Sequence, residues 1–447
     1  MSREIRLLAF DMASVGHIQQ GMWRHPRDRS ADYLDLDRWT ALARTLERGL
    51  FDGLFLADVL GVYDVYRGGP EAAIRGAVQI PNGDPLLLVS AMAAATRDLG
   101  FGVTVNLGAE APALLARRFS TLDHLTRGRI AWNIVTGYLD SAARALGQGA
   151  QAAHDDRYDR ADTTLDTLYA LWEGSWADDA VVRDRVGDVF ADPTRVRPIV
   201  RDSDAVRLDA IHLVSPSPQR TPVLFQAGAS ARGRAFAARH AECVFVNGTT
   251  PSQVATIVAD LRARAVAEGR GARDLTVFVG ATVVLGKTDE DAAALLAEYR
   301  AVESKEAALA HASGSLGIDF AALDPDDPIP TAGGPAGIAS NREAASAMTP
   351  RRFTDNLILG GRQRPIVGSA ATVADTLQTW VEQADVDGFM LARTVTPECF
   401  EAVVDLLVPE LQRRGLYKTA YAQGAWRAKL TGDPRLPARH MAANHRH

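Results

Sequence analysis

The sequence of 447 residues contains few groups that would cross-link a chain or anchor it in a membrane. Its two cysteines, Cys243 and Cys399, are too few for a disulfide framework, and Cys243 lies in an apolar run that is typical of a buried core. No window approaches the roughly 20 consecutive apolar residues of a membrane span. The N-terminal MSREIRLLAFDM has no apolar segment of secretory length after a basic start. We therefore expect a soluble, cytoplasmic protein with no membrane partner.

A strong charge of either sign is also missing. Lysine and arginine number 49 and aspartate and glutamate 55, which gives a net charge of −6, and no block of like charge occurs. This balance argues against nucleic acid or an anionic membrane as the main partner. Apolar residues make up 47% and charged residues 23%, as is ordinary for a globular protein long enough to bury a large core.

Several catalytic and metal-binding motifs are absent as well. The sequence has no H-E-x-x-H and no Cys/His cluster, so we expect no metal site. His440, His445 and His447 lie in a basic C-terminal segment and are expected to be solvated. The motif G-x-S-x-G is absent, which disfavours hydrolysis by a covalent nucleophile. Chemistry by a bound organic cofactor fits a large protein with few candidate acids and bases better.

What the sequence does contain is a regular alternation of short apolar runs with helix-like segments. Eight candidate strands occur, at residues 5–10, 51–58, 99–107, 128–135, 221–228, 241–248, 275–285 and 386–393. Most are continuously apolar, as expected for strands buried on both faces. Strand and helix in alternation indicate a parallel sheet, and eight such units predict an α/β fold of the (β/α)8 TIM-barrel type. An open, doubly wound sheet is the alternative.

The chain is longer than a plain barrel, which needs about 250 residues. We expect a single barrel domain at 1–435 with insertions at about 59–84, 176–220 and 311–368 near its C-terminal face, then a tail at 436–447. The third insertion is rich in Gly, Pro and Asp. A segment of that length and composition is typical of a lid over an active site.

Polar side chains gather where the predicted strands end. Asp58 ends the second, Asn106 the third, and Asn133, Thr136 and Tyr138 surround the end of the fourth. Any one of them has an ordinary explanation as a turn or helix cap. Asn133 is the most informative, because an amide buried inside an apolar strand needs hydrogen-bond partners and a ligand can supply them.

A second pattern is QAGASARGRAF (226–236). A strand ends at Ala227 and Gly228, and after Ala229 the side chain of Ser230 is placed to cap a helix that runs from Arg232 to His240. The backbone N–H groups of such a turn form an anion site, although a plain capped helix remains the alternative. His17 lies just beyond the first strand and His311 opens the third insertion, both at the barrel mouth; each is either functional or a satisfied structural histidine.

Several long blocks resemble one family. They are GMWRHP (21–26), FDGLFLAD (51–58), STLDHLTRGRIAWNIVT (120–136), HDDRYDRADTTLDTLYALWEGSW (154–176), PSPQRTPVLFQAG (216–228) and residues 407–421. Together they resemble the bacterial-luciferase-like flavin monooxygenases, in the branch of nitrilotriacetate monooxygenase component A, dibenzothiophene-sulfone monooxygenase and long-chain alkane monooxygenase. The resemblance is closest to the alkane enzyme, through VYDVYRG (62–68) and AVQIP (77–81).

The resemblance implies a two-component enzyme. Reduced FMN would come from a separate NAD(P)H-dependent flavin reductase, and O2 would be the co-substrate that oxidises an organic molecule through a flavin peroxide or hydroperoxide. Homo-oligomers, dimers or tetramers, are implied as well. A non-catalytic flavin-binding protein and a deazaflavin-dependent dehydrogenase are the alternatives.

The resemblance also implies roles for individual residues. Asn133 would contact the isoalloxazine edge and Asp58 the ring system, with Asn106 beside them. The ribityl phosphate would be held by Tyr138, Tyr158, Ala227, Gly228, Ala229 and Ser230. The catalytic candidates are His17, Tyr63, Gln79 and His311.

Departures from the family pattern bear on the substrate. Ser14 stands where the alkane enzyme has Cys, and Tyr138 where it has His. Ala109, Ala111 and Ala113 occupy positions where Tyr and His are common. The loss of these donors predicts a wider, less polar pocket for a bulky hydrophobic or heterocyclic substrate, riboflavin among them. A long-chain alkane or an aryl sulfone is the alternative, whereas aminocarboxylates, which need cationic clamps, are not favoured.

Overall fold

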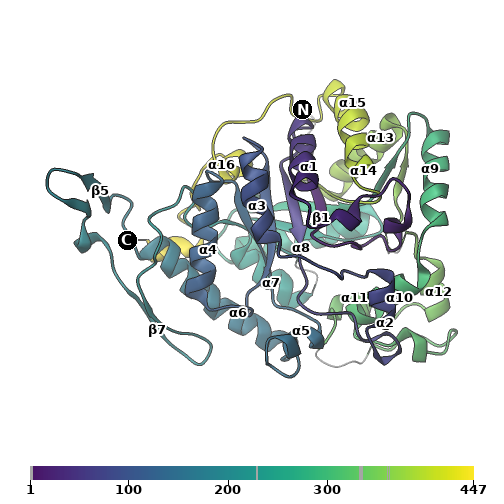
Figure 1. The fold of residues 1–447 in the computed structure, drawn as a ribbon, viewed down its shortest axis with the longest axis horizontal. Helices are drawn as coiled ribbons and strands as arrows, with labels where there is room; N and C mark the ends of the chain where they lie inside the picture. Colours follow the sequence, from purple (N-terminus) through teal and green to yellow (C-terminus); the bar gives the residue numbers. More distant parts are fainter. Residues whose placement is uncertain (1–3, 228–229, 332–335, 360, 362, 447) are drawn as a thin grey trace.

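The protein is built on a closed barrel of eight parallel strands. The computed structural model describes residues 4–227, 230–331, 336–359, 361 and 363–446. Around the barrel the strands follow the order β1 (Arg6–Met12), β14 (Gly388–Ala392), β11 (Thr276–Ala281), β10 (Cys243–Val246), β9 (Val223–Gln226), β4 (Ile130–Val135), β3 (Gly100–Asn106) and β2 (Gly53–Ala57). Each of the eight predicted runs contains one barrel strand, and closure of the sheet rules out the open, doubly wound alternative (Figure 1).

Helices cover the outside of the barrel. Those that follow successive strands are α1 (Leu36–Arg48), α3 (Pro85–Ala94), α4 (Pro112–Leu125), α6 (His154–Tyr169), α7 (Ala231–His240), α8 (Pro251–Ala267), α13 (Ala370–Ala384), α14 (Glu398–Ala402) and α15 (Val408–Arg413). Several begin where a short polar side chain caps the first turn; Asp35, for example, accepts a hydrogen bond from the N–H of Asp37. No helix in the described ranges is long and apolar enough to cross a membrane.

The barrel interior is filled by large side chains from alternate strand positions. Phe55, Phe225 and Phe278 lie in one buried cluster, with ring centroids 5.5 Å apart for Phe55 and Phe225. Cys243 lies in the same cluster with none of its surface exposed, which confirms its prediction as a core residue. Chemistry is therefore confined to the ends of the barrel, as in other folds of this type.

A short C-terminal helix, α16 (Trp426–Thr431), closes the N-terminal end of the barrel. A Cβ on Gly53 or Gly100 would come within 2.7 or 2.3 Å of the Trp426 ring, so glycine is needed at both positions. Arg427 is fully buried and bonds the Glu242 carboxylate through Nε at 2.6 Å. Its other nitrogens donate to the carbonyls of Gln219, Thr221 and Pro434.

The first and third insertions pack against each other over the opposite end. The first contains the short helix α2 (Glu71–Gly76). After β11 come β12 (Val283–Leu285), α9 (Asp289–Ala301), α10 (Lys305–Leu316), α11 (Ala339–Ala345), α12 (Pro350–Asp355) and β13 (Ile366–Gly368). A separate apolar cluster joins Tyr63, Tyr66 and Val78 of the first insertion to Leu316 and Phe353 of the third. Figure 1 shows α2, α10 and α12 together at the lower right.

The second insertion projects from the side of the barrel. It contains two antiparallel hairpins, β5 (Val181–Asp184) with β6 (Val189–Ala191), and β7 (Ile199–Asp202) with β8 (Arg207–Ala210). The remaining helix of the loops, α5 (Asp140–Ala145), follows β4.

Three expectations need correction. The run 275–285 is two strands, because the chain leaves the barrel after Ala281 and β12 pairs with β13. His311 does not open an insertion; it lies inside α10, which begins earlier because Ser304 caps it. His440 is not solvated: it is 1% exposed, and its Nε2 lies 3.0 Å from the carbonyl oxygen of His240. His447 lies outside the described residues.

Replacing Arg427 by alanine is expected to lower the free energy of unfolding by about 3–5 kcal/mol, because it leaves the Glu242 carboxylate buried without its partner. Chemical denaturation followed by circular dichroism measures the change. The matched control is Arg413→Ala, which removes an exposed arginine paired with Glu410 and should leave the unfolding midpoint unchanged. Equal midpoints for the two variants would contradict the proposed role of Arg427.

Candidate active site

At the C-terminal end of the barrel a polar pair lies above the aromatic interior. Asn133 on β4 is 3% exposed, and its Nδ2 donates to Oγ1 of Thr104 on β3 at 2.9 Å. Its Oδ1 is buried without a hydrogen-bond partner among the described residues. An unsatisfied buried amide oxygen is unfavourable, so it marks a place where a ligand N–H would be stabilising.

Four of the sequence-predicted catalytic residues meet near this end of the barrel. The Tyr63 hydroxyl donates to Gln79 Oε1 at 2.9 Å and lies 2.5 Å from the Tyr138 hydroxyl. The Tyr63 ring lies 5.0 Å from the His311 ring, and Gln79 Nε2 donates to the His17 carbonyl at 3.4 Å. We call these five residues, His17, Tyr63, Gln79, Tyr138 and His311, the histidine–tyrosine cluster.

The small residues of α10 allow this cluster to form. A Cβ on Gly314 would lie 2.4 Å from Tyr63 Cδ1, so the tyrosine ring is seated against the bare backbone of that helix turn. His311 precedes Gly314 by three residues and therefore lies on the same face of the helix. The small residues of AHASGS (310–315) indicate a close approach to this helix, although the sequence does not show which ring packs there.

Burial keeps Tyr63, Tyr138 and His17 of this cluster in their uncharged forms. Burial, reinforced by Tyr138, raises the pKa of Tyr63 well above its ordinary value, and burial also raises the pKa of Tyr138. Burial, with smaller effects of Arg393 and His311, lowers the pKa of His17 well below its ordinary value. His17 Nδ1 is buried and has no partner among the described residues. The cluster therefore offers uncharged hydrogen-bonding groups.

Arg393, at the end of β14, fixes the loop that carries Ser14 and His17. Its NH1 lies 2.8 Å from Asp11 Oδ1, and both side chains are buried. Its NH2 donates to the carbonyls of Ser14 and Val15 at 2.9 and 2.7 Å. Sequence reasoning missed Arg393, although a charged residue at the end of an apolar strand was a usable signal.

Asp58 is linked through Asn82 to the loop that carries Ser14 and His17. Its Oδ1 accepts a hydrogen bond from Asn82 Nδ2 at 2.8 Å, and Asn82 in turn bridges to Ser14 through the backbone. Burial raises the pKa of Asp58 to about 6, against the opposing effect of the Asn82 hydrogen bond. Asn82 Oδ1 is buried without a partner in the described chain.

A second group of polar side chains surrounds the start of α7. Ser230 Oγ accepts from the N–H of Gly233 at 3.0 Å, which confirms that it caps this helix. His154 Nε2 lies 3.3 Å from the same Oγ, and Gln226 Nε2 donates to the Tyr158 hydroxyl at 3.3 Å. Gln226 Oε1 is buried and unpaired among the described residues. Ala227 ends the strand segment, whereas Gly228 and Ala229 lie outside the described residues.

Several predicted site residues have contacts other than those expected for them. Tyr138, expected beside the phosphate, has its hydroxyl on Tyr63 instead of with Tyr158. Asn106 is half-buried, and its Oδ1 accepts from the N–H of Gly108. Ala109 and Ala113 are half-buried and Ala111 is exposed, all at the turn into α4. Sequence reasoning did not anticipate Asn82, Thr104, His154 or Gln226.

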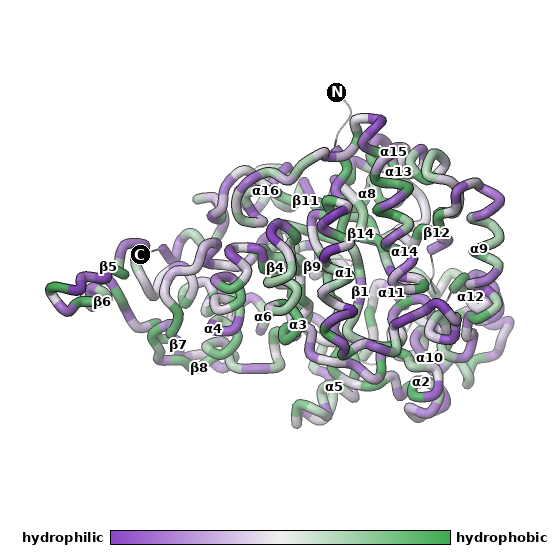
Figure 2. Tube along the Cα trace, turned by 45° about the horizontal axis from the view of Figure 1, so that its top comes forward, coloured by the Kyte–Doolittle hydropathy of each residue, from purple (hydrophilic) through white to green (hydrophobic). Residues whose placement is uncertain are grey.

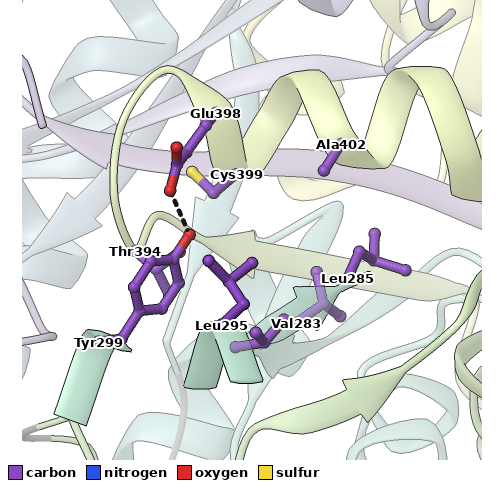
Figure 3. A pocket seen from close by; sticks show the side chains of 9 residues that line it. Val283, Leu285, Leu295, Tyr299, Thr394, Glu398, Cys399 and Ala402 are labelled. Carbon is purple, nitrogen blue, oxygen red and sulfur yellow. Dashed lines mark hydrogen bonds between the residues drawn. The ribbon is translucent and has the colours of Figure 1, made fainter. Parts of the chain in front are cut away.

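A small cavity lies behind the strand ends, between β12, α9 and α14 (Figure 3). It measures 150 Å³ and is lined by Val283, Leu285, Leu295, Tyr299, Thr394, Glu398, Cys399 and Ala402, among others. The Tyr299 hydroxyl donates to Glu398 across one end at 2.7 Å. Pockets for cofactor-sized ligands occupy about 300–1,000 Å³, so this cavity is too small for a flavin.

A parallel barrel whose strand ends hold buried, unsatisfied polar groups belongs to the enzymes that bind a ligand at the C-terminal mouth. The protein-family model for luciferase-like monooxygenases matches residues 17–388 of this chain. The chain therefore belongs to this family of flavin-dependent, oxygen-incorporating oxidoreductases.

Three relatives are similar over almost their whole lengths. The dimethyl-sulfide monooxygenase of Hyphomicrobium sulfonivorans is 46% identical over 100% of this chain and 94% of its own. The long-chain alkane monooxygenase of Geobacillus thermodenitrificans is 45% identical over 100% and 99%. The crystal structure of a riboflavin lyase with modified FMN and riboflavin superposes with a TM-score of 0.95 at 34% identity, covering 100% of both chains.

Asp58→Asn is expected to change how stability depends on pH. Because the folded pKa of about 6 exceeds the ordinary 3.8, the folded chain binds this proton more tightly than the unfolded chain. The contribution of Asp58 to the free energy of unfolding is therefore fully present at low pH. It is lost as the pH rises through 6, which lowers the free energy of unfolding by up to about 3 kcal/mol. Urea unfolding of both proteins across this range should show that the free energy of unfolding of the variant increases relative to that of the wild type as the pH rises. Parallel profiles would contradict the raised pKa.

Proposed function

We propose that the protein is a reduced-FMN-dependent monooxygenase that receives its flavin from a separate NAD(P)H-dependent reductase and oxidises a neutral, hydrophobic organic substrate. The observation that carries this proposal is the histidine–tyrosine cluster, which brings hydrogen-bonding groups together at the barrel mouth and in which burial keeps His17 and Tyr63 uncharged. Membership of a flavin-dependent monooxygenase family supports the cofactor and the co-substrate, O2.

The residues present fit FMN. The unpaired Oδ1 of Asn133 is suited to accept a hydrogen bond from a ring N–H of the isoalloxazine. Ser230, His154 and Tyr158, with the N-terminus of α7, provide donors for the phosphate. Bound reduced FMN would supply the electrons that activate O2.

The protein's own groups orient the substrate and manage protons. The Tyr63 hydroxyl has one proton, which it donates to Gln79, so its oxygen is left to accept from Tyr138 or from a substrate. Burial keeps His17 in its neutral form, and its unpaired Nδ1 is available to hydrogen-bond a reacting oxygen. The apolar cluster of the two insertions excludes water around these atoms.

The electrostatics favour a neutral substrate. Arg393, the cation beside His17, forms a buried ion pair with Asp11, and its NH2 donates to two backbone carbonyls, so its charge is already matched within the protein. A polyanionic substrate needs such a cation as a clamp. The substrates named for the relatives at 46% and 45% identity, dimethyl sulfide and long-chain alkanes, carry no negative charge, whereas the polyanion nitrilotriacetate is named for a relative at 30% identity. The small side chains of Ala109 and Ala113 leave room for a bulky or heterocyclic member of this class.

Purified protein with FMN, NADH and a generic flavin reductase should consume one neutral compound of a panel of dimethyl sulfide, long-chain alkanes, aryl sulfones, riboflavin and, as the anionic member, nitrilotriacetate. The loss should require both reductase and O2, and the product should contain oxygen from isotopically labelled O2. Mass spectrometry measures both. Consumption of nitrilotriacetate alone would overturn the neutral-substrate proposal, and no consumption with tight FMN binding would favour a non-catalytic flavin-binding protein.

Tyr63→Phe is the matched variant for this assay, because it keeps the ring seated on Gly314 and removes only the hydroxyl. It should lower the turnover number while leaving the affinity for FMN unchanged. An unaltered turnover number would remove Tyr63 from the catalytic group.

Asn133→Ala is expected to weaken FMN binding by about tenfold, the loss of one hydrogen bond made in a buried site, or about 1.4 kcal/mol. Flavin fluorescence titration measures the dissociation constant without any turnover. Asn356→Ala, which truncates an exposed asparagine at the end of α12, is the control and should bind FMN as the wild type does. Equal affinities for the two variants would place the flavin elsewhere.

A further inference from the structure

The small cavity between β12, α9 and α14 contains a polar group that the protein leaves unsatisfied. Thr394, just beyond the end of β14, lines this cavity and is 2% exposed. Its Oγ1 is buried without a hydrogen-bond partner among the described residues. Voids larger than a water molecule are few in protein interiors, and a buried hydroxyl without a partner is unfavourable. A cavity of 150 Å³ beside such a group therefore indicates a binding site.

This cavity lies outside the barrel sheet. Figure 2 shows β12, α9 and α14 side by side at the right of the barrel, where β12 contacts both helices. None of the described residues that line the cavity belongs to the histidine–tyrosine cluster or to the group around the start of α7. A ligand in the cavity is therefore independent of the proposed flavin site.

The cavity has a polar side and an apolar side. Figure 3 shows Tyr299, Thr394 and Glu398 on one side and Leu285 and Ala402 on the other. The rest of the lining is aliphatic except for one cysteine. A ligand that matches both sides has an apolar body and a single polar group.

The polar side carries no unmatched charge. Glu398 accepts hydrogen bonds from Arg27 Nε at 2.6 Å and from the Tyr299 hydroxyl at 2.7 Å. Burial raises the pKa of the Cys399 thiol to about 12, so this group is protonated at neutral pH. The Glu398 carboxylate would repel an anion, and a cation would have to compete with Arg27. The neutral Thr394 hydroxyl both donates and accepts, so it suits the hydroxyl of an uncharged ligand.

The polar side also lies close to solvent. The side chains of Arg27 and Glu398, which form an ion pair beside it, are 48% and 27% exposed. Exposed ion pairs contribute little to stability, so this pair is a weak barrier between the cavity and the surface. It offers a route to Thr394 that leaves the barrel strands in place.

The volume of the cavity limits the size of its ligand. An apolar cavity of about 150 Å³ holds one benzene molecule, and phenol adds a single hydroxyl to that ring. We propose that this cavity binds a neutral alcohol or phenol of about six or seven non-hydrogen atoms. The ligand hydroxyl bonds Thr394, and the apolar body lies against Leu285 and Ala402.

The test uses phenol as the probe, with toluene and benzoate as comparators that replace its hydroxyl by a methyl group and by a carboxylate. In ligand-observed NMR titrations, the full-length protein should bind phenol saturably and should not bind benzoate. Thr394→Val, which removes the hydroxyl at nearly constant volume, should weaken phenol binding by about tenfold and leave toluene affinity unchanged. Absence of saturable phenol binding would overturn the proposal, as would equal changes for phenol and toluene in the variant.

A second variant tests the location of the probe. Ala402→Leu fills the apolar side and should abolish phenol binding, whereas FMN affinity and the unfolding midpoint should stay as in the wild type. Ala293→Leu, which makes the same change at an exposed position of α9, is the control and should keep wild-type phenol affinity. Wild-type phenol affinity in Ala402→Leu would overturn the proposal.

A crystal of the unmodified protein soaked with phenol gives a measurement that does not depend on how the variants fold. Density for the ring should lie between Leu285 and Thr394. Density only at the barrel mouth would overturn the proposal and would leave the proposed function untouched.

Discussion

The active site depends on the packing of two insertions that are far apart in the sequence. Tyr63, from the loop after β2, rests against Gly314 of α10, and this contact brings its hydroxyl and the His311 ring together over the barrel mouth. The barrel supplies Asn133, Thr104 and the His17 loop, but it holds neither Tyr63 nor His311. The apolar cluster between the insertions therefore positions Tyr63 and His311, the proposed catalytic residues.

Each end of the barrel contains a buried arginine–carboxylate ion pair. At the N-terminal end, Arg427 and Glu242 form a buried ion pair in which carbonyl oxygens accept from the other guanidinium nitrogens. At the C-terminal end, the Arg393–Asp11 pair is also buried, and Arg393 NH2 donates to the backbone of the loop that carries His17. Burial, and not the ion pairs, keeps the His17 and Tyr63 side chains in their uncharged forms, and Arg393 adds to the lowering of the His17 pKa.

The fold was largely predictable from the sequence, because continuous apolar runs followed by amphipathic helices leave few topologies open. Asn133 was predictable for the same reason, since an amide stands out in an apolar strand. Thr104 and Gln226 were not, because threonine and glutamine near strand ends have no distinctive local pattern. The hydroxyl contact of Tyr138 with Tyr63 and the burial of His440 depend on long-range packing, and no local periodicity encodes such contacts.

Several buried polar atoms at the C-terminal end of the barrel have no hydrogen-bond partner among the described residues. His17 Nδ1, Asn82 Oδ1 and Asn133 Oδ1 are buried on the strand ends or on the loops that follow β1 and β2, without partners among the described residues. Each costs on the order of 1–3 kcal/mol while unsatisfied. A ligand that satisfies these atoms regains this free energy on binding. Without a ligand, the packed interior and the N-terminal end closed by α16 stabilise the barrel. The instability of the mouth is thus a source of affinity for whatever the enzyme binds there.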